Sequence, residues 1–463
     1  MPQIRLRRLL AAVVSPALTA ALVVTLTTAH GHPAPALAET AATTANPVTP
    51  GNFTGYGFDQ CQAPSQAAMD TWLQRSPYLA VGVYMSGASR GCRNQTYLNA
   101  TWVSTQLANG WKILPITLGP QASCQPRFPR YGNDRKIDAT PGPQGLYGDA
   151  RRQGTAEATK TVANAKALGL VPGSTMFYDL EAFDASNTRC AQSALRFLSA
   201  WTNQIHKLGY LSGVYSSGNS GIRVLDRARV QQAGTYAMPD QLWIADWNHQ
   251  AGVGSSYVTS TAWMPHARVK QYWGGHDESY GGVRINIDRD FLDLGKGTTA
   301  PGVSHCGGIN VNLGGTYQNL GPATPTAKPY PAGVKAAKCL LKEQGYFHGR
   351  VRPTSYGPPM VTAVSRFQTD HGWTATGTIA QREWVALLSA GTHPVVKYGS
   401  GGENVRDLQR ALDAAHPKLD LPITGVFADM TTAAVKAYQT KHHLPVTGVG
   451  APGVWADLAA GLA

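Results

Sequence analysis

The sequence predicts an α/β protein with a TIM-type (β/α)8 barrel over residues 53–296, followed by two small all-α domains of three helices each. Three observations predict this fold class. Eight strand-like runs alternate with amphipathic stretches in the barrel region. That region holds about 240 residues, which is the usual size of such a barrel. The last third of the chain repeats itself with an offset of 71 residues and shows the apolar spacing of short helices.

The strand-like runs can be placed one by one. They lie at 56–59, 78–85, 111–118, 175–181, 210–216, 241–247, 268–273 and 283–288. Amphipathic stretches at 97–108, 153–168 and 191–208 are long enough to return the chain, so that successive strands run parallel. Gly and Ser dominate after Trp247, and we expect the sixth crossover to be irregular.

Residues 1–38 have the pattern of an export signal. Arg5, Arg7 and Arg8 precede an apolar run at 9–26, and Ala36-Leu37-Ala38 offers a cleavage site of small residues. The adjacent arginines leave both Sec and twin-arginine export open. Residues 39–52 then form a linker. We expect a secreted or wall-associated mature protein with no membrane span, since no second long apolar segment follows.

The chain has an even number of cysteines, as expected for a secreted protein with disulfide bonds. Six cysteines allow 15 connectivities. Sequential pairing closes the most local loops, so we expect the pairs Cys61–Cys92, Cys124–Cys190 and Cys306–Cys339. No CxxC or Cys/His spacing indicates a zinc site, and we expect no metal and no cofactor.

The net charge is +13, and removal of the three arginines of the export signal leaves +10. A basic secreted protein favours polyanionic surroundings. Nucleic acid is the competing partner, but only 14% of the residues are charged and no basic run is interleaved with aromatics. A wall polymer is therefore the expected partner.

The C-terminal third begins after a segment rich in Gly, Pro, Thr and Asn at 297–330, which has the composition of a linker. The offset of 71 residues places Gln368 on Gln439, Gly377 on Gly448 and similar apolar residues on one another. We expect one domain at 331–391 and a second at 395–463. Each domain is expected to have a single small helical core.

The second copy has the pattern Val405-x-x-Leu408-Gln409, then Gly425-x-Phe427, then Ala434-Val435-x-x-Tyr438-Gln439, and finally Gly448 and Trp455. This pattern resembles the peptidoglycan-binding-like domain of cell-wall hydrolases. The first copy differs in having Ala337-Lys338 and Tyr356-Gly357-Pro358-Pro359 at two motif positions. The resemblance implies wall binding, while purely structural or partner-docking helical domains remain the alternative.

Several carboxylates follow the predicted strands. Asp179 and Glu181 are two residues apart at the end of an apolar run, so a strand would point both to one side with α-carbons about 6.5 Å apart. Asp59, Asp246 and Asp288 lie at or near the ends of other strands. In a TIM-type barrel the strand ends converge on one mouth, where active sites lie. The sequence therefore predicts a carboxylate cluster there.

Aromatic and amide side chains at a similar depth are candidates for sugar binding. Aromatic rings stack on sugar rings, and amides hydrogen-bond their substituents. The predicted substrate-binding residues are Tyr84, Tyr215, Asp246, Trp247, Gln271 and Tyr272.

Six short motifs recur in the order of a known family: Gly57-Phe58-Asp59, Val81-Gly82-Val83-Tyr84, Tyr178-Asp179-Leu180-Glu181, Gly213-Val214-Tyr215-Ser216-Ser217, Trp243-Ile244-Ala245-Asp246-Trp247 and Ile285-Asn286-Ile287-Asp288. They resemble the glycoside-hydrolase-like barrel called domain of unknown function 1906, which is similar to the family 25 lysozymes. The resemblance implies that Asp59, Asp179, Glu181 and Asp288 form the catalytic site.

The function implied by this resemblance is cleavage of β-1,4 glycosidic bonds in peptidoglycan, as in a lysozyme or muramidase. Glu181 would protonate the leaving oxygen, and Asp179 would stabilise positive charge at the anomeric carbon, either directly or by orienting the N-acetyl group of the substrate. Asp59 and Asp288 would hold substrate hydroxyls or tune Glu181.

The main alternative is a non-catalytic protein whose barrel binds wall glycan without cleaving it. Four carboxylates at the strand ends favour the enzyme, because a pure binder has no need of a repulsive Asp-x-Glu cluster. Other enzyme classes have weaker support. There is no Gly-x-Ser-x-Gly motif with suitable partners, and an amidase or peptidase would need zinc ligands or a free cysteine.

Overall fold

The computed structural model describes residues 45–125, 131–295, 302–322 and 330–463. The predicted export signal at 1–38 lies outside the described residues, as does part of the predicted linker at 297–330. None of the helices in the described ranges combines the length and apolar composition needed to cross a bilayer.

The predicted barrel is confirmed as a closed sheet of eight strands in chain order. Strands β1 to β7 run parallel to one another. Strand β8 runs antiparallel to both β7 and β1 and closes the barrel. The strands are β1 Thr54–Asp59, β2 Ala80–Ser86, β3 Lys112–Thr117, β4 Thr175–Asp179, β5 Leu211–Ser217, β6 Gln241–Ala245, β7 Ala267–Tyr280 and β8 Val283–Leu294.

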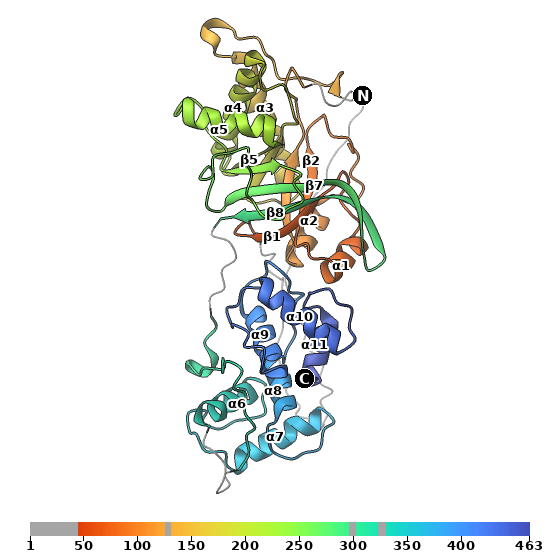
Figure 1. The fold of residues 1–463 in the computed structure, drawn as a ribbon, viewed down its shortest axis with the longest axis vertical. Coiled ribbons are helices and arrows are strands. Elements are labelled where there is room, and N and C mark those ends of the chain that lie inside the picture. Colours follow the sequence, from red (N-terminus) through yellow and green to blue (C-terminus); the bar gives the residue numbers. More distant parts are fainter. Residues whose placement is uncertain (1–44, 126–130, 296–301, 323–329) are drawn as a thin grey trace, which may run out of the picture. The chain divides into compact units, whose positions relative to one another are not determined.

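The direction of β8 follows from a two-glycine turn. Gly281 and Gly282 both have positive φ, at 57° and 81°, which is the backbone of a tight hairpin turn. The turn leaves no room for a crossover helix, so β8 reverses and pairs with β7 along a long hairpin (Figure 1). As a result Asp288 lies in the middle of β8, directly opposite Asp59 of β1, and not at a strand end as the sequence predicted.

Helices cover the outside of the barrel, and they are α1 Gln66–Arg75, α2 Ala100–Ala108, α3 Gly148–Ala167, α4 Thr188–Lys207 and α5 Arg223–Gln231. Asn187 starts α4, because its side chain accepts a hydrogen bond from Cys190 N. Phe197 and Trp201 on the same helix pack on Tyr178 of β4. Residues 246–266 contain turns and no helix, which confirms the predicted irregular sixth crossover.

All three predicted disulfides are confirmed. Cys61 pairs with Cys92, Cys124 with Cys190 and Cys306 with Cys339, with Cα–Cα distances of 5.6, 6.0 and 5.9 Å. The second pair joins the loop after β3 to the first turn of α4, so it ties down two segments beside the predicted site.

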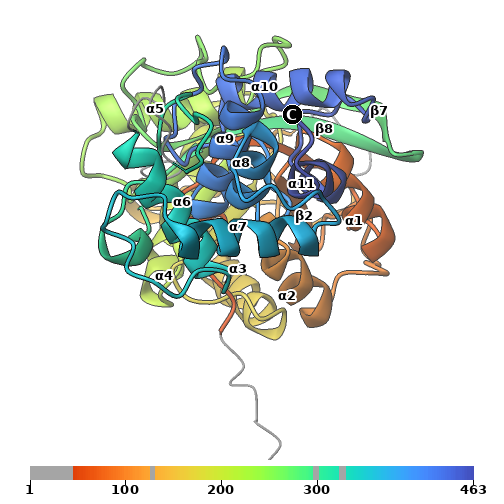
Figure 2. The same ribbon diagram turned by 90° about the horizontal axis from the view of Figure 1, so that it is seen from below.

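The C-terminal region is helical and repeats a three-helix unit. Helices α6 Pro331–Glu343, α7 Pro358–Asp370 and α8 Gln381–Leu388 form the first unit, and α9 Glu403–Ala415, α10 Asp429–Lys441 and α11 Pro452–Ala459 form the second. Figures 1 and 2 both show α8 and α9 side by side, and the two units share one apolar core. Equivalent glutamines make the same hydrogen bond in the two units. Gln368 accepts from Gly377 N, and Gln439 accepts from Gly448 N.

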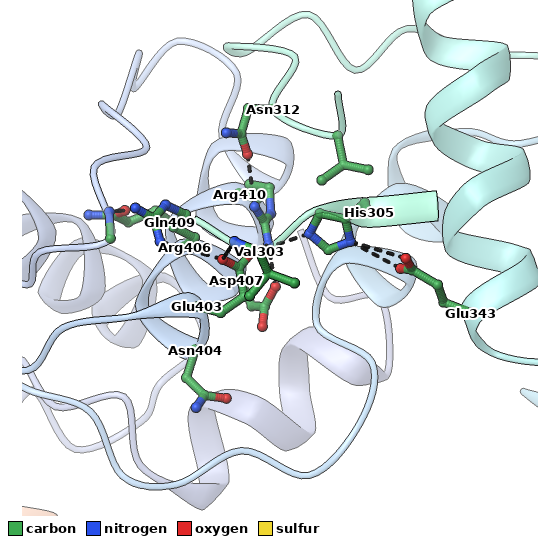
Figure 3. A network of polar contacts seen from close by, with 12 residues as sticks. Val303, His305, Asn312, Glu343, Glu403, Asn404, Arg406, Asp407, Gln409 and Arg410 are labelled. Carbon is green, nitrogen blue, oxygen red and sulfur yellow. Dashed lines mark hydrogen bonds and ion pairs between the residues drawn. The ribbon is translucent and has the colours of Figure 1, made fainter. Parts of the chain in front are cut away.

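A buried ionic network joins the two units (Figure 3). Arg410 is 2% exposed and donates to the carboxylates of Glu403 and Asp407 and to Oδ1 of Asn312. His305 lies between Glu343 of the first unit, at 3.1 Å, and Glu403 of the second, at 3.3 Å. Bonds from Arg410 and His305 lower the pKa of Glu403 despite its burial, so this carboxylate is charged at neutral pH.

Candidate active site

The mouth of the barrel holds a cavity of about 490 Å³ at the C-terminal ends of the parallel strands. Its lining includes eight of the ten side chains predicted from the sequence: Asp59, Tyr84, Glu181, Tyr215, Asp246, Trp247, Gln271 and Asp288. Asp179 does not line the cavity but is buried beside it, 1% exposed. The fold therefore places most of the predicted site residues around one cavity.

Tyr272 was predicted in this group and lies elsewhere. Gln271 points into the cavity, and in a strand the next residue points to the opposite side. The ring of Tyr272 is buried on the outer side of the barrel, where its electrostatic neighbours include Tyr56 and Arg289. Its position gives it no contact with a ligand in the mouth.

Gln271 forms hydrogen bonds at the floor of the cavity through both the nitrogen and the oxygen of its side-chain amide. Its Nε2 donates to Asp59 Oδ2 at 2.8 Å and to Asp288 Oδ2 at 3.2 Å. Its Oε1 accepts from Tyr215 Oη at 3.0 Å and from Trp247 Nε1 at 2.9 Å. Two acceptors on one side and two donors on the other fix the orientation of the amide. This single side chain thus holds two carboxylates and two aromatic rings in place.

Asp290 is a member of the site that the sequence interpretation missed. It lies two residues after Asp288 on β8, so both side chains point into the barrel. It is 0% exposed, and Trp243 Nε1 donates to its Oδ1 at 2.9 Å. Its second neighbour is Asp59, whose charge raises the pKa of Asp290 in addition to burial. The signal was the spacing Asp288-x-Asp290, which has the same period as Asp179-x-Glu181.

Two buried carboxyl groups of the site, Asp59 and Asp290, have raised pKa values. Burial raises the pKa of Asp59, and the nearby charge of Asp288 raises it further. Burial and then the charge of Asp59 raise the pKa of Asp290 well above its usual range. Asp290 therefore lies beside Asp59 as a second buried carboxyl group with a raised pKa.

Replacement of Asp290 by Asn is expected to stabilise the protein above pH 4. An elevated folded-state pKa means that the folded state binds more protons than the unfolded state, so stability falls as pH rises from the unfolded value of about 3.9. Asn can still accept the hydrogen bond from Trp243 Nε1 and does not titrate. Thermal unfolding between pH 3 and pH 8 should show a gain in Tm that is absent at the acid end and grows as pH rises. A gain that is uniform with pH would contradict the assignment.

Glu181 and Asp179 are held by the loop after β3. Gln121 Oε1 accepts from Glu181 N at 2.9 Å, and its Nε2 donates to the carbonyl oxygen of Asp179, also at 2.9 Å. Tyr131 Oη donates to Glu181 Oε1 at 3.2 Å, and Tyr84 Oη donates to Asp179 Oδ2 at 3.3 Å. Each carboxylate thus has a hydroxyl donor, and Glu181 is the one that also reaches the cavity.

Two tyrosines remain neutral donors in the site. Burial raises the pKa of both Tyr84 and Tyr215, and the nearby carboxylates Asp179 and Glu181 raise it further. At neutral pH both phenols therefore keep the O–H with which they donate, Tyr84 to Asp179 and Tyr215 to Gln271.

The rim carries an exposed aromatic surface. Trp247 is 51% exposed although Nε1 is bonded to Gln271, so its indole ring faces solvent above the cavity. A Cβ on Gly274 would lie 2.2 Å from Cζ2 of this ring, so glycine is required there for the ring to adopt its position. Ser255 Oγ donates to Asp246 Oδ2 at 2.8 Å, which fixes a second rim residue. The cavity is also lined by Ser217, Asn219, Tyr257 and Asn286, which were not among the predicted site residues.

The described residues contain one group of three metal-ligand side chains within 4.8 Å of one another, namely Cys306, Cys339 and Glu343. Its two cysteines form a disulfide, so the group offers a single carboxylate and no thiolate. It also lies in the helical region and takes no part in the barrel site.

Two family models match the chain. Residues 70–292 match the Rv2525c-like, glycoside hydrolase-like domain, and residues 331–387 and 401–457 each match the putative peptidoglycan binding domain. A comparison with curated proteins gave no match.

Three solved structures illustrate the structural similarity. An uncharacterized B. stearothermophilus protein shares 17% identity, with 51% of this chain and 95% of that chain covered and a TM-score of 0.32. The Mycobacterium tuberculosis Tat-secreted protein Rv2525c, in complex with L-tartrate, shares 14% identity over 52% of this chain and 95% of that chain, with a TM-score of 0.33. The modular autolysin LytC from Streptococcus pneumoniae shares 13% identity over 51% of this chain and 46% of that chain, with a TM-score of 0.31.

Proposed function

Since residues 70–292 form an Rv2525c-like, glycoside hydrolase-like domain and two peptidoglycan binding domains follow it, we propose that this protein is an exported glycoside hydrolase of the cell wall. The proposed reaction is lysozyme-like cleavage of β-1,4 glycosidic bonds in peptidoglycan. The helical repeats would hold the enzyme on its polymeric substrate, and export would follow the Sec or twin-arginine route.

One observation carries the proposal: the carboxyl groups Asp59, Glu181 and Asp288 meet around one cavity at the active end of the barrel, with Asp179 beside it. Glycosidases use such carboxyl groups as acid and as base or nucleophile. A cavity of about 490 Å³ has the size of a site for a small organic group such as a sugar unit.

In the proposed mechanism, Glu181 protonates the glycosidic oxygen, because it is the carboxyl of the Asp-x-Glu pair that reaches the cavity. The hydroxyl of Tyr131, which contacts Oε1, orients the carboxyl group. Asp179 lies deeper and stabilises the positive charge that develops at the anomeric carbon, directly or through the N-acetyl group of the substrate. The Tyr84 hydroxyl holds Asp179 in position.

Asp59 and Asp288 hold the sugar from below. Gln271 bridges them, and the neutral Asp290 supports Asp59 from the interior. Gly275 N donates to Asp288 Oδ1, and the lone pairs that remain on the carboxyl oxygens can accept hydrogen bonds from sugar hydroxyls. Asp290 touches no substrate in this scheme and acts as a positioning residue.

Trp247 is proposed as a sugar-stacking platform at the rim. A Trp247→Ala variant is expected to raise KM about tenfold with a smaller change in kcat, because an exposed ring supplies binding on the order of 1 kcal/mol that is similar in the ground state and the transition state. Trp247→Phe, which keeps a stacking face but loses the N–H bond to Gln271, should restore most of the affinity. A large loss of kcat in both variants would instead place the main role of Trp247 in orienting Gln271.

The proposal is tested by incubating purified peptidoglycan with the mature protein and measuring the release of reducing ends. Release that depends on the intact site supports a glycosidase. Sedimentation with the wall without any release would support the alternative, a barrel that binds glycan without cleaving it.

A further inference from the structure

The two helical repeats differ in one surface region, which is an open groove in the second repeat and is filled by side chains in the first. In the second repeat, a groove of about 190 Å³ lies between the end of α9 and α10. Its walls are mainly apolar and include Leu412, Leu419, Ala437 and Tyr438, while its basic lining residues are His416 and Lys441. No carboxylate lines it.

In the first repeat, side chains occupy the corresponding place. The offset of 71 residues matches Ala437 to Arg366, Tyr438 to Phe367 and Lys441 to Asp370. The ring of Tyr346 packs edge-on against Phe367 with ring centroids 5.3 Å apart, and the guanidinium of Arg366 lies 5.9 Å from the Tyr346 ring. Burial raises the pKa of the Tyr346 hydroxyl, and the nearby Asp370 raises it further. The second repeat has Pro417 in place of Tyr346, so nothing equivalent covers its groove.

The chemistry of the open groove favours a peptide over a sugar. Sugar rings are recognised by exposed aromatic faces, but Tyr438 is only 6% exposed and its ring lies 4.3 Å from that of His442. Small apolar walls accept side chains of alanine size. The ammonium of Lys441, with no acid in the lining, favours a carboxylate.

We propose that the second repeat, and not the first, binds the carboxyl end of a short aliphatic peptide in the groove between α9 and α10. Peptide branches of this class occur in peptidoglycan, so the inference rests on the proposed wall substrate and adds which part of it the repeats hold. The barrel would then engage the glycan while the second repeat engages a peptide branch.

The test is calorimetry of the full chain with N-acetyl-Ala-Ala, prepared as L,L and D,D isomers and as a free acid or a C-terminal amide. We expect one binding site with a Kd in the millimolar range, and about three- to fivefold weaker binding of the amide, as for loss of an exposed charge pair. Lys441→Glu should weaken binding of the acid at least fivefold.

Ala437→Arg copies the residue of the first repeat and should abolish binding by filling the groove. Ala437 is exposed, so the change does not disturb the core. Ala456→Arg on α11 is the matched control, since it places the same residue on an exposed face away from the groove, and it should leave the affinity unchanged. Arg366→Ala should also have no effect.

Absence of peptide binding by the parent chain, or binding that survives both Ala437→Arg and Lys441→Glu, would overturn the inference. Tight binding of N-acetylglucosamine oligomers that Ala437→Arg abolishes would overturn it as well, in favour of a sugar site. The soluble peptides contain no glycosidic bond. Peptide binding without wall hydrolysis would therefore refute the proposed catalysis alone, and hydrolysis without peptide binding would refute this inference alone.

Discussion

A Glu181→Gln variant is expected to lose 10²- to 10⁴-fold in the rate of reducing-end release from peptidoglycan, because general acid catalysis typically contributes a factor of about this size. The amide keeps the shape of the side chain and can still accept the hydrogen bond from Tyr131. It cannot donate a proton to the leaving oxygen. The rate should fall through kcat, since the interaction is made only in the transition state.

The matched control is Asp420→Asn, which removes one carboxylate by the corresponding acid-to-amide substitution at an exposed position in the helical region. It should leave the rate unchanged. Both variants should sediment with the wall like the parent and unfold at a similar temperature. If Glu181→Gln retained more than a tenth of the parental rate, Glu181 would not be the acid.

Arg410→Met is expected to destabilise the helical region by about 3–5 kcal/mol, which is the usual result of removing one partner of a buried ionic network. The loss leaves the carboxylates of Glu403 and Asp407 without their shared cation. Burial already raises the pKa of Asp407 despite the neighbouring guanidinium, so its desolvation is not fully offset even in the parent. Thermal or denaturant unfolding measures the change.

An added Asp407→Asn substitution should recover part of this loss, because the double variant no longer buries that unpaired charge. Arg350→Ala is a suitable control, since Arg350 is exposed and should change the free energy of unfolding little. Equal stability of the Arg410→Met variant and the Arg350→Ala variant would show that the network contributes nothing to folding.

Most of the barrel was predictable because its signals are local. Each strand is an apolar run with a turn after it, and the cysteine pairs close short loops. The direction of β8 was not predicted, because the runs at 268–273 and 283–288 were counted as two of eight strand-helix units. The polar residues between them extend β7 to Tyr280, and the decisive signal was the pair Gly281-Gly282.

In the site, too, some features were predictable from local sequence signals and others were not. Residues at strand ends were found because a barrel brings all strand ends together, whichever residues they carry. Tyr272 was misplaced because the prediction considered only its position along the strand. Adjacent residues of a strand point to opposite sides, so Tyr272 points out of the barrel while Gln271 points into it. The roles of Gln271 and Asp290 as partners of Asp59 depend on contacts between β1, β7 and β8, which only the register of the antiparallel strand defines.

The most direct measurement is the chemical identity of the ends released from peptidoglycan. Digestion by the mature protein, borohydride reduction and mass spectrometry would identify the sugar that carries each new reducing end. The proposed muramidase-like activity predicts reduced N-acetylmuramic acid in products of the parent and none with Glu181→Gln. Soluble fragments without new reducing ends, or no fragments from protein that still sediments with the wall, would contradict a glycosidase acting on this polymer.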